Sequence, residues 1–522
     1  MKTDIPYLRR QDNTAQLIVD GQPLILLAGE LHNSSASSLE YLKPIWPRLA
    51  ALRLNTVLAP LSWELIEPEE GRFDFHLLDG MVEQARAHGL HLVLLWFGTW
   101  KNSFSGYVPA WVKTDLARFP RAQLKPGLNA PVISPFGEEI RACDARAFAA
   151  VMRRIGEIDA GRQTVVMMQA ENEVGLLGTT RDWSEPGQRA FADAVPEILL
   201  QALDLRRDAL LPEVAEPWRR SGWRMAGTWP EVFGVDAPEI FMAWHLARHI
   251  EAVAAAGRQA YDLPVYVNAW LRQPGMEQAG HYPSGGPVSG MLDIWRAAAP
   301  HVDFLAPDIY LPTFKAVCAE YTRGGNFLFI PESWNDTRAA TAAFYAIAQH
   351  QAIGFAPFAI DDLTPDNPLA ETYAVLTEMM PLLTRISKDR MAGFFQESDD
   401  EQCQCLVGNY QLRLRATAPL QASEPPAGGM VIALDEPDTF LIVGRKLSVE
   451  FATPGAPAPN VEFLQVDAGE MQHGQWITTR RLNGDETGHH CVIRLGDHLE
   501  VQRVCINRAA VPIHFFHQIG PL

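Results

Sequence analysis

The chain has 522 residues, a formal net charge of −18, 47% hydrophobic residues and 20% charged residues. This length exceeds one ordinary hydrophobic core, so we expect two or three globular domains, and the composition excludes a disordered protein. The negative charge argues against a nucleic-acid groove and against an anionic membrane surface, so neither nucleic acid nor a membrane is an expected partner.

No stretch has the length and apolarity of a membrane-spanning helix, and the first residues lack the apolar run of a signal peptide. As written, the sequence indicates a cytoplasmic protein, or a periplasmic or secreted one whose signal has been removed. The six cysteines form no CxxC pair, and we expect buried free thiols rather than a structural bridge.

The first two thirds of the chain alternate short apolar runs with amphipathic stretches. The runs are nearly continuously apolar, as in parallel strands that are covered on both faces. Helical stretches such as residues 39–52 and 77–88 lie between them, the second ending at Gly89, a typical helix terminus. Eight such units predict an α/β fold, a (β/α)8 TIM barrel over residues 1–383. The eight strands are expected at residues 24–31, 56–63, 91–98, 164–170, 264–270, 302–310, 327–331 and 352–360.

Long insertions follow the third and fourth predicted strands. The second insertion runs from about residue 176 to residue 262 and is rich in tryptophan. Long loops at the C-terminal face of a barrel usually shape the substrate cleft, but these rings could equally pack an accessory subdomain. The tryptophans are Trp183, Trp218, Trp223, Trp229 and Trp244.

After about Leu383 the helical periodicity fades, and short β-rich pieces alternate with Gly, Pro and Asp. This pattern predicts a second domain over residues 384–522, an antiparallel β-sandwich. The Pro- and Ala-rich stretch 416–429 is expected to be a loop. The role of this domain cannot be read from the sequence.

The segment QAENEVG at residues 169–175 follows the fourth predicted strand and places an Asn-Glu pair at its C-terminal end. A general acid near neutral pH needs a raised pKa, which burial beside another carboxylate provides. Strand alternation puts Glu171 and Glu173 on the same face, so either could be catalytic. Asn172 is placed to bind a sugar hydroxyl beside the anomeric carbon.

A second carboxylate, Glu332, follows the seventh predicted strand in the segment PESW at residues 331–334. Two carboxylates at the ends of separate barrel strands suggest glycoside hydrolysis, which needs two carboxyl groups beside one glycosidic bond. Glu332 would be the ionised nucleophile, with Tyr310 at the end of the preceding strand as a hydrogen-bond donor.

Three stretches give the chain a resemblance to glycoside hydrolase family 35, the β-galactosidase family, and to its bacterial branch with an appended C-terminal β domain. They are LNTV at 54–57 leading to Trp63 and EPEEGRFDF at 67–75, then QAENEVG, then PESW. The resemblance implies that Glu173 is the acid/base, that Glu332 is the nucleophile and that Trp63 lies in the substrate site.

The chain departs from the family pattern around the sugar pocket. Asn33 follows His32 where the family often has an aromatic residue, and Glu64 follows Trp63 where it often has Asn. The usual Cys-Ala-Glu-Trp run after strand three is replaced by WKNS at residues 100–103, whereas PAW at 109–111 matches the family's Pro-x-Trp.

Further residues at the strand ends are candidate sugar contacts. Lys101 and Asn102 could donate to hydroxyls at C3 and C4. Trp270 and Trp334 could form an aromatic platform, and Glu30 and His32 end the first strand.

The resulting hypothesis is a retaining exo-β-galactosidase that releases terminal galactose from oligosaccharides or glycoconjugates. A β-glucosidase or arabinopyranosidase, and a non-catalytic carbohydrate-binding protein, are the alternatives. We expect an oligosaccharide partner, no metal and no cofactor, because carboxylates perform the proton and covalent steps. The oligomeric state is open, with a homodimer as one option.

Overall fold

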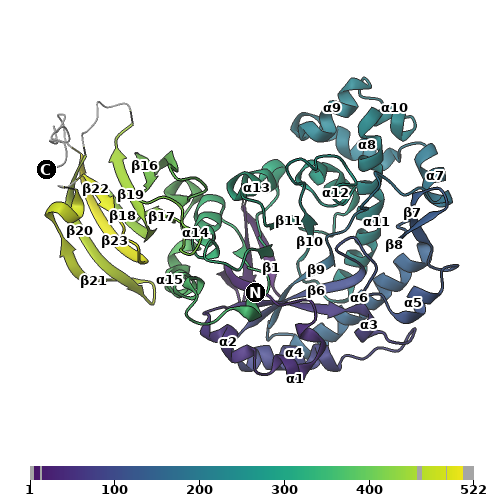
Figure 1. The fold of residues 1–522 in the computed structure, drawn as a ribbon, viewed down its shortest axis with the longest axis horizontal. Helices are drawn as coiled ribbons and strands as arrows, with labels where there is room; N and C mark the ends of the chain where they lie inside the picture. The colour runs from purple at the N-terminus through teal and green to yellow at the C-terminus, as the bar shows by residue number, and fades with distance from the viewer. Residues whose placement is uncertain (1–4, 12–13, 455–460, 489–490, 509–522) are drawn as a thin grey trace.

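The computed structural model describes residues 5–11, 14–454, 461–488 and 491–508. Eight parallel strands pair in the order β12-β11-β10-β9-β6-β5-β4-β13. The barrel closes because Ile330, just before β12, bridges Phe355 of β13 in parallel. This arrangement confirms the predicted TIM barrel (Figure 1). The strands are β4 (Leu26–Glu30), β5 (Thr56–Ser62), β6 (His91–Lys101), β9 (Val165–Asn172), β10 (Val265–Trp270), β11 (Phe304–Ile309), β12 (Glu332–Ser333) and β13 (Gly354–Phe355).

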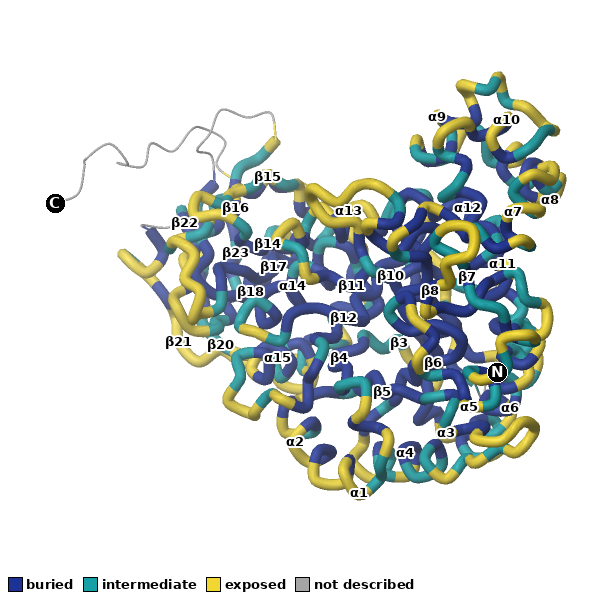
Figure 2. The backbone as a smooth tube through the Cα atoms, turned by 45° about the vertical axis from the view of Figure 1, so that its right-hand side comes forward, coloured by how far each residue is buried: buried dark blue, intermediate teal, exposed yellow. Residues whose placement is uncertain are grey.

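Both faces of the barrel strands are buried, which explains their continuous apolar sequence. On β6, Val93 and Leu95 belong to the cluster that fills the barrel, whereas Leu92 and Leu94 pack into the larger core that includes the helices. Figure 2 shows this burial through the middle of the molecule.

Helices surround the barrel. The predicted helix 39–52 is split in two around Pro44, which has no backbone N–H to continue the first helix. The helices of the ring are α1 (Leu39–Leu42), α2 (Trp46–Ala51), α3 (Trp63–Ile66), α4 (His76–Ala87), α6 (Glu138–Asp159), α11 (Ala237–Ala260), α12 (Leu292–Ala298), α13 (Phe314–Tyr321), α14 (Ala339–His350) and α15 (Pro368–Leu383).

The insertions form structure of their own. After β6 come α5 (Ala110–Thr114) and the hairpin of β7 (Arg121–Lys125) and β8 (Leu128–Ile133). The second insertion folds into a helical lobe on the side of the barrel away from the C-terminal domain (Figure 1). Its helices are α7 (Glu185–Ala192), α8 (Glu197–Asp204), α9 (Pro212–Arg220) and α10 (Trp229–Phe233).

The tryptophans of the second insertion pack this lobe. Trp218 and Trp229 are fully buried. The ring of Trp218 lies 5.1 Å from that of Trp223, and Trp229 lies 5.2 Å from Phe241 of α11. Of the two interpretations of these rings, the accessory subdomain therefore fits better than the substrate cleft.

A three-stranded antiparallel sheet precedes the barrel and was not predicted. It consists of β1 (Tyr7–Gln11), β2 (Thr14–Val19) and β3 (Gln22–Leu24). Leu17 and Val19 join the cluster inside the barrel, so this sheet covers the N-terminal end of the strands. The pair Asp20-Gly21 was the sequence feature that could have predicted this sheet. Both residues have positive φ, as a tight hairpin turn requires.

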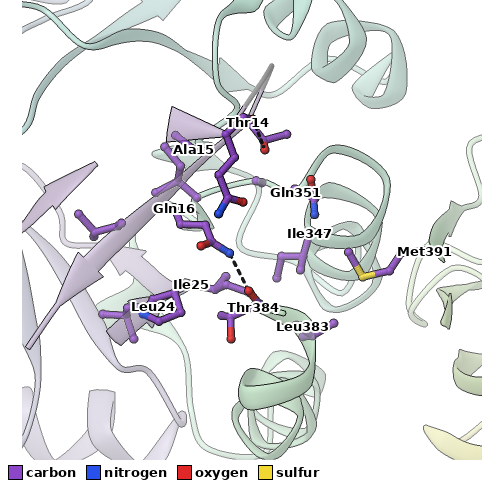
Figure 3. A pocket seen from close by; sticks show the side chains of 15 residues that line it. Thr14, Ala15, Gln16, Leu24, Ile25, Ile347, Gln351, Leu383, Thr384 and Met391 are labelled. Atoms are coloured by element: carbon purple, nitrogen blue, oxygen red, sulfur yellow. Dashed lines mark hydrogen bonds between the residues drawn. The ribbon is translucent and has the colours of Figure 1, made fainter. Parts of the chain in front are cut away.

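Where this sheet meets α14 and α15, a small cavity of about 40 Å³ remains. Figure 3 shows its lining, in which the Gln16 amide donates a 2.7 Å hydrogen bond to the carbonyl oxygen of Thr384. Ile25 and Ile353, at the starts of barrel strands, also line it. The cavity therefore lies at the end of the barrel opposite to the C-terminal ends of the strands.

The C-terminal part is the predicted antiparallel β-sandwich. One sheet has six strands, in the order β14 (Met391–Phe395), β17 (Gly428–Ala433), β18 (Thr439–Arg445), β23 (Glu500–Arg508), β20 (Val461–Gln472) and β21 (Gln475–Leu482). The other has four, in the order β15 (Gln402–Val407), β16 (Tyr410–Ala416), β19 (Leu447–Ala452) and β22 (Val492–Arg494). The predicted loop 416–429 lies between β16 and β17 and overlaps the end of the first and the start of the second.

Two remaining expectations concern thiols and membranes. Of the six cysteines, Cys143 and Cys318 are buried and the other four are partly exposed, so the expectation of buried thiols holds for two of them. Among the described residues, no helix combines the length and apolarity needed to cross a membrane.

The six-stranded sheet packs directly on the barrel. Met430 and Ile432 of β17 belong to the same hydrophobic cluster as the barrel helices. Helix α14 comes so close that a Cβ atom added to Gly428 would lie 2.5 Å from the Cβ atom of Thr341. The glycine is what lets the helix lie on the sheet.

We expect Gly428→Ala to lower the free energy of unfolding by about 1–3 kcal/mol, because the added methyl group forces α14 away from β17. Urea denaturation of the full chain measures this. Gly106→Ala is the matched control, because its added Cβ has no neighbour within 4 Å. Equal stabilities of the two variants would contradict the close packing of helix and sheet.

Candidate active site

A cavity of about 390 Å³ opens at the C-terminal ends of the barrel strands. Its lining combines carboxylates, amides, one lysine and aromatic rings contributed by several strands, as a catalytic site on this fold does. The lining residues are Asn33, Lys101, Asn102, Glu173, Trp270, Leu271, Gln273, Asp308, Tyr310, Leu311, Glu332 and Phe358.

The end of β9 departs from regular strand geometry. Glu171 and Glu173 both have positive φ, 62° and 45°. Glu171 does not line the cavity, and its carboxylate accepts hydrogen bonds from the backbone N–H groups of Thr99 at 3.1 Å and Trp100 at 2.6 Å. The expectation that Glu171 and Glu173 share a face is wrong, because these backbone bonds draw Glu171 into the wall between β9 and β6.

Glu173 lies in the cavity and is largely buried. Its backbone N–H donates to the side-chain oxygen of Asn268 at 3.1 Å, and the amide of Asn102 donates to its carboxylate. Burial, followed by the negative charge of Glu332, raises the pKa of Glu173 to about 7, against a smaller opposing effect of Lys101. A carboxyl group with this pKa can hold a proton near neutral pH and deliver it.

Glu332 faces the same cavity from β12. The Tyr310 hydroxyl donates to one of its oxygens at 3.1 Å, and the Asn172 amide contacts the other at 3.4 Å. Burial, then the charge of Glu332, raises the pKa of Tyr310 above its ordinary value, so this hydroxyl remains a donor. The structure thus places Tyr310 as the predicted donor to Glu332, and it adds a contact of Asn172 with Glu332 that the sequence did not predict.

Two further carboxyl groups, Glu30 and Asp308, lie beside this pair. Burial, then the charge of Glu332, raises the pKa of each well above its ordinary value. Within the described part of the chain, neither oxygen of Glu30 has a hydrogen-bond partner. Lys101 is buried among these groups and donates a 3.0 Å hydrogen bond to the side-chain oxygen of Asn172.

Trp63 and Trp334 do not line the cavity, so their prediction as sugar contacts is wrong. Trp63 starts α3 and is fully buried, and its indole N–H donates to Glu67 at 2.8 Å. The indole N–H of Trp334 donates to the carbonyl oxygen of Tyr310 at 2.9 Å, which turns the ring toward Phe314. Of the proposed aromatic platform, Trp270 alone faces the cavity.

The two residues expected at the end of the first strand, Glu30 and His32, are not among those that line the cavity. His32 is held by Asp361, 3.0 Å from Nδ1, and by Asp362, 3.4 Å from Nε2. Its neighbour Asn33 lines the cavity instead. Glu30 is fully buried, and its carboxyl group interacts electrostatically with Glu332, Lys101 and Glu173.

The sequence analysis missed Asn268, Asp308, Gln273 and Phe358 as site residues. Asn268 is the clearest case, because it is a polar residue inside the apolar strand β10. Its side chain joins Glu173 to Asp308 by accepting from the Glu173 backbone and donating to Asp308 at 2.8 Å. An amide residue inside an otherwise apolar strand could have marked Asn268 as part of the site.

Two family models match parts of the chain. The glycoside hydrolase family 42 model, described as β-galactosidase, matches residues 45–198, and a domain of unknown function, DUF5597, matches residues 369–494. The first match contains Glu173, and the second spans α15 and most of the sandwich. Each covers less than half of the chain, and the matching model is family 42 rather than the expected family 35.

A stretch of 82 residues is 37% identical to a β-galactosidase of Xanthomonas manihotis. This stretch is 15% of the present chain and 14% of that protein, so the two share only a short region.

Solved structures with a similar fold include the cold-adapted β-galactosidase of Rahnella sp. R3, with a TM-score of 0.48 and 15% identity over 70% of this chain and 57% of that one. The β-galactosidase of Bacillus circulans sp. alkalophilus has a TM-score of 0.48 and 13% identity, over 70% of this chain and 58% of that one. The β-amylase catalytic domain of Paenibacillus polymyxa has a TM-score of 0.46 and 12% identity, over 67% of this chain and 97% of that one. At these values the structures say nothing about the activity of this chain.

We expect Glu332→Gln to lower the pKa of Glu173 below about 7, because the substitution removes a negative charge that raises this pKa. Titration of ¹³C-labelled glutamate carboxyls by NMR measures the shift, and the Glu173→Gln spectrum assigns the signal. Glu371→Gln, an exposed glutamate on α15, is the charge-matched control. An unchanged pKa would contradict the coupling of the two carboxyls.

Proposed function

We propose that the protein is a retaining glycoside hydrolase that releases terminal β-linked galactose from oligosaccharides or glycoconjugates. The observation that carries this proposal is the pair of strand-end carboxylates in one cavity. Glu173 is raised in pKa to about 7, and Glu332 is held by the donors Tyr310 and Asn172. Two carboxyl groups with separated roles are what this chemistry requires.

In this mechanism Glu332 attacks the anomeric carbon while Glu173 protonates the departing glycosidic oxygen. The glycosyl ester on Glu332 is then hydrolysed by a water molecule that Glu173, now ionised, deprotonates. The long 3.4 Å contact between Asn172 and Glu332 leaves the Asn172 amide available for the sugar hydroxyl next to the anomeric carbon. Such a bond strengthens in the transition state.

Galactose as the sugar rests on the match of residues 45–198 to the β-galactosidase model and on the family 35 resemblance. The proposal that the enzyme removes terminal sugars, the exo mode of action, also rests on that resemblance. Lys101 and Asn102, expected on sugar hydroxyls, already donate to Asn172 and Glu173. This favours, as a second candidate, a retaining β-glycosidase with another sugar, such as a β-glucosidase or arabinopyranosidase.

A panel of aryl β-glycosides tests the sugar and the two residues together. We expect turnover of the galactoside, a loss of about 10²–10⁴-fold for Glu173→Gln, and a larger loss for Glu332→Gln because the nucleophile is removed. NMR of the first sugar released should show the β-anomer, as retention demands.

The outcomes of this panel separate the alternatives. Turnover of another β-glycoside would keep the mechanism and replace galactose. Release of the α-anomer would refute the double displacement. If no glycoside is hydrolysed and Glu332→Gln binds sugars as tightly as the parent protein, the chain is a carbohydrate-binding protein.

The dependence of kcat/KM on pH follows from the protonation of Glu173. Because the general acid must be protonated, we expect kcat/KM to fall as the pH rises through about 7. Lys101→Met removes a positive charge that lowers this pKa, so the alkaline limb should move to higher pH. Lys113→Met, whose ammonium group pairs with Glu64, is the control. A limb that stays in place or moves to lower pH would contradict the assignment of the acid.

A further inference from the structure

A second cavity, of about 310 Å³, adjoins the cavity that holds the catalytic carboxylates. Leu271, Gln273 and Leu311 line both of them. Leu271 follows β10 directly, and Leu311 lies shortly after β11. The two cavities are therefore neighbouring parts of one cleft, which runs from the strand ends toward α13.

The charged side chains that line the second cavity are mainly acidic, and the rest of the lining is largely apolar. Its charged lining residues are Glu213, Glu277, Glu320 and Arg272. Arg272 donates a 2.9 Å hydrogen bond to the Tyr282 hydroxyl oxygen. One oxygen of Glu213 accepts a 2.8 Å hydrogen bond from Arg323, and the other has no partner within the described residues. Carboxylate oxygens accept hydrogen bonds from hydroxyl groups and repel other anions. Such a lining suits a neutral sugar and disfavours a uronic acid.

We infer that this second cavity is the subsite for the leaving-group side of the substrate, and that it holds a neutral sugar residue. The inference rests on the proposed glycosidase function. The substrate would then be a neutral oligosaccharide whose terminal unit sits between Glu173 and Glu332, with the next unit past Gln273. Glu173 protonates the oxygen between these two units, so the leaving sugar departs through the second cavity.

A third cavity, of about 430 Å³, lies between the barrel and the sandwich, beside Trp334 and Leu420. Its lining residues include none of those that line the catalytic cavity. It is therefore the weaker route for the leaving group, and it provides a comparison for the experiment.

Three alanine-to-tryptophan variants test the inference. Ala316 is an exposed residue of α13 that lines the second cavity, and Ala316→Trp fills the cavity. Ala319→Trp changes an exposed residue of the same helix that lies outside the cavity lining. Ala422→Trp fills the third cavity from an exposed loop. Each is assayed on an activated aryl glycoside and on neutral oligosaccharides with the same terminal sugar.

We expect Ala316→Trp to lower kcat/KM on the oligosaccharides by about ten-fold or more, a loss of about 1.4 kcal/mol, mainly through KM. Its rate on the aryl glycoside should stay near the parent value, because a good leaving group with a small aglycone depends little on a second cavity. Ala319→Trp and Ala422→Trp should match the parent protein on both substrates.

Equal oligosaccharide rates for Ala316→Trp and Ala319→Trp would overturn the inference, as would a loss confined to Ala422→Trp. Efficient release of the terminal sugar from a uronic acid would overturn the predicted neutral substrate. The aryl glycoside separates the two proposals. If the parent protein does not hydrolyse it, the proposed function is refuted. If the parent protein does hydrolyse it, the variants test the subsite alone.

Discussion

The placement of Lys101 among buried carboxyl groups is the constraint on which the site depends. Glu30, Glu173, Asp308 and Glu332 meet at the strand ends, and their mutual repulsion together with burial raises the pKa of the first three. Four buried negative charges would be prohibitively costly, so protons must be retained on some of them. Lys101, together with hydrogen bonds from Asp308 and Asn102, opposes this effect at Glu173, whose pKa is raised to about 7. The pKa of Glu173 is thus set by a balance between neighbours, not by one partner.

That balance requires a rigid connection between β6 and β9. Glu171 supplies it by accepting two backbone hydrogen bonds from Thr99 and Trp100, just before Lys101. Burial, then the charge of Asp144, raises the pKa of Glu171 well above its ordinary value. Glu171 makes these bonds with a positive φ, and Glu173 has a positive φ as well. Glu171, which does not line the cavity, thus links the strand that carries Glu173 to the strand that carries Lys101.

The sequence predicted those parts of the fold that rest on repeated local patterns. Eight continuous apolar runs predicted the eight barrel strands, although the seventh run, residues 327–331, ends just before β12. Their polar ends pointed to Glu173 and Glu332, which the structure places in one cavity. It could not separate Glu171 from Glu173, because strand alternation assumes regular φ and the deviation depends on contacts with β6 that are distant in sequence. The prediction that Trp63 contacts the sugar was wrong for a related reason. Helix α3 starts at this residue, and the ring is buried in the core. The sheet β1–β3 was missed although Asp20-Gly21 is a hairpin signal.

Acidity links the catalytic cavity to the cavity beyond it. The Glu332 carboxylate, whose charge raises the pKa of Glu173, also makes the strand ends unfavourable for an anionic sugar, and Glu213, Glu277 and Glu320 place further acidic groups along the cleft. A cationic cleft would have admitted acidic substrates but would have lowered the pKa of the general acid. Tuning the acid and selecting a neutral substrate are therefore two consequences of one charge distribution, and a change that neutralises it should alter both together.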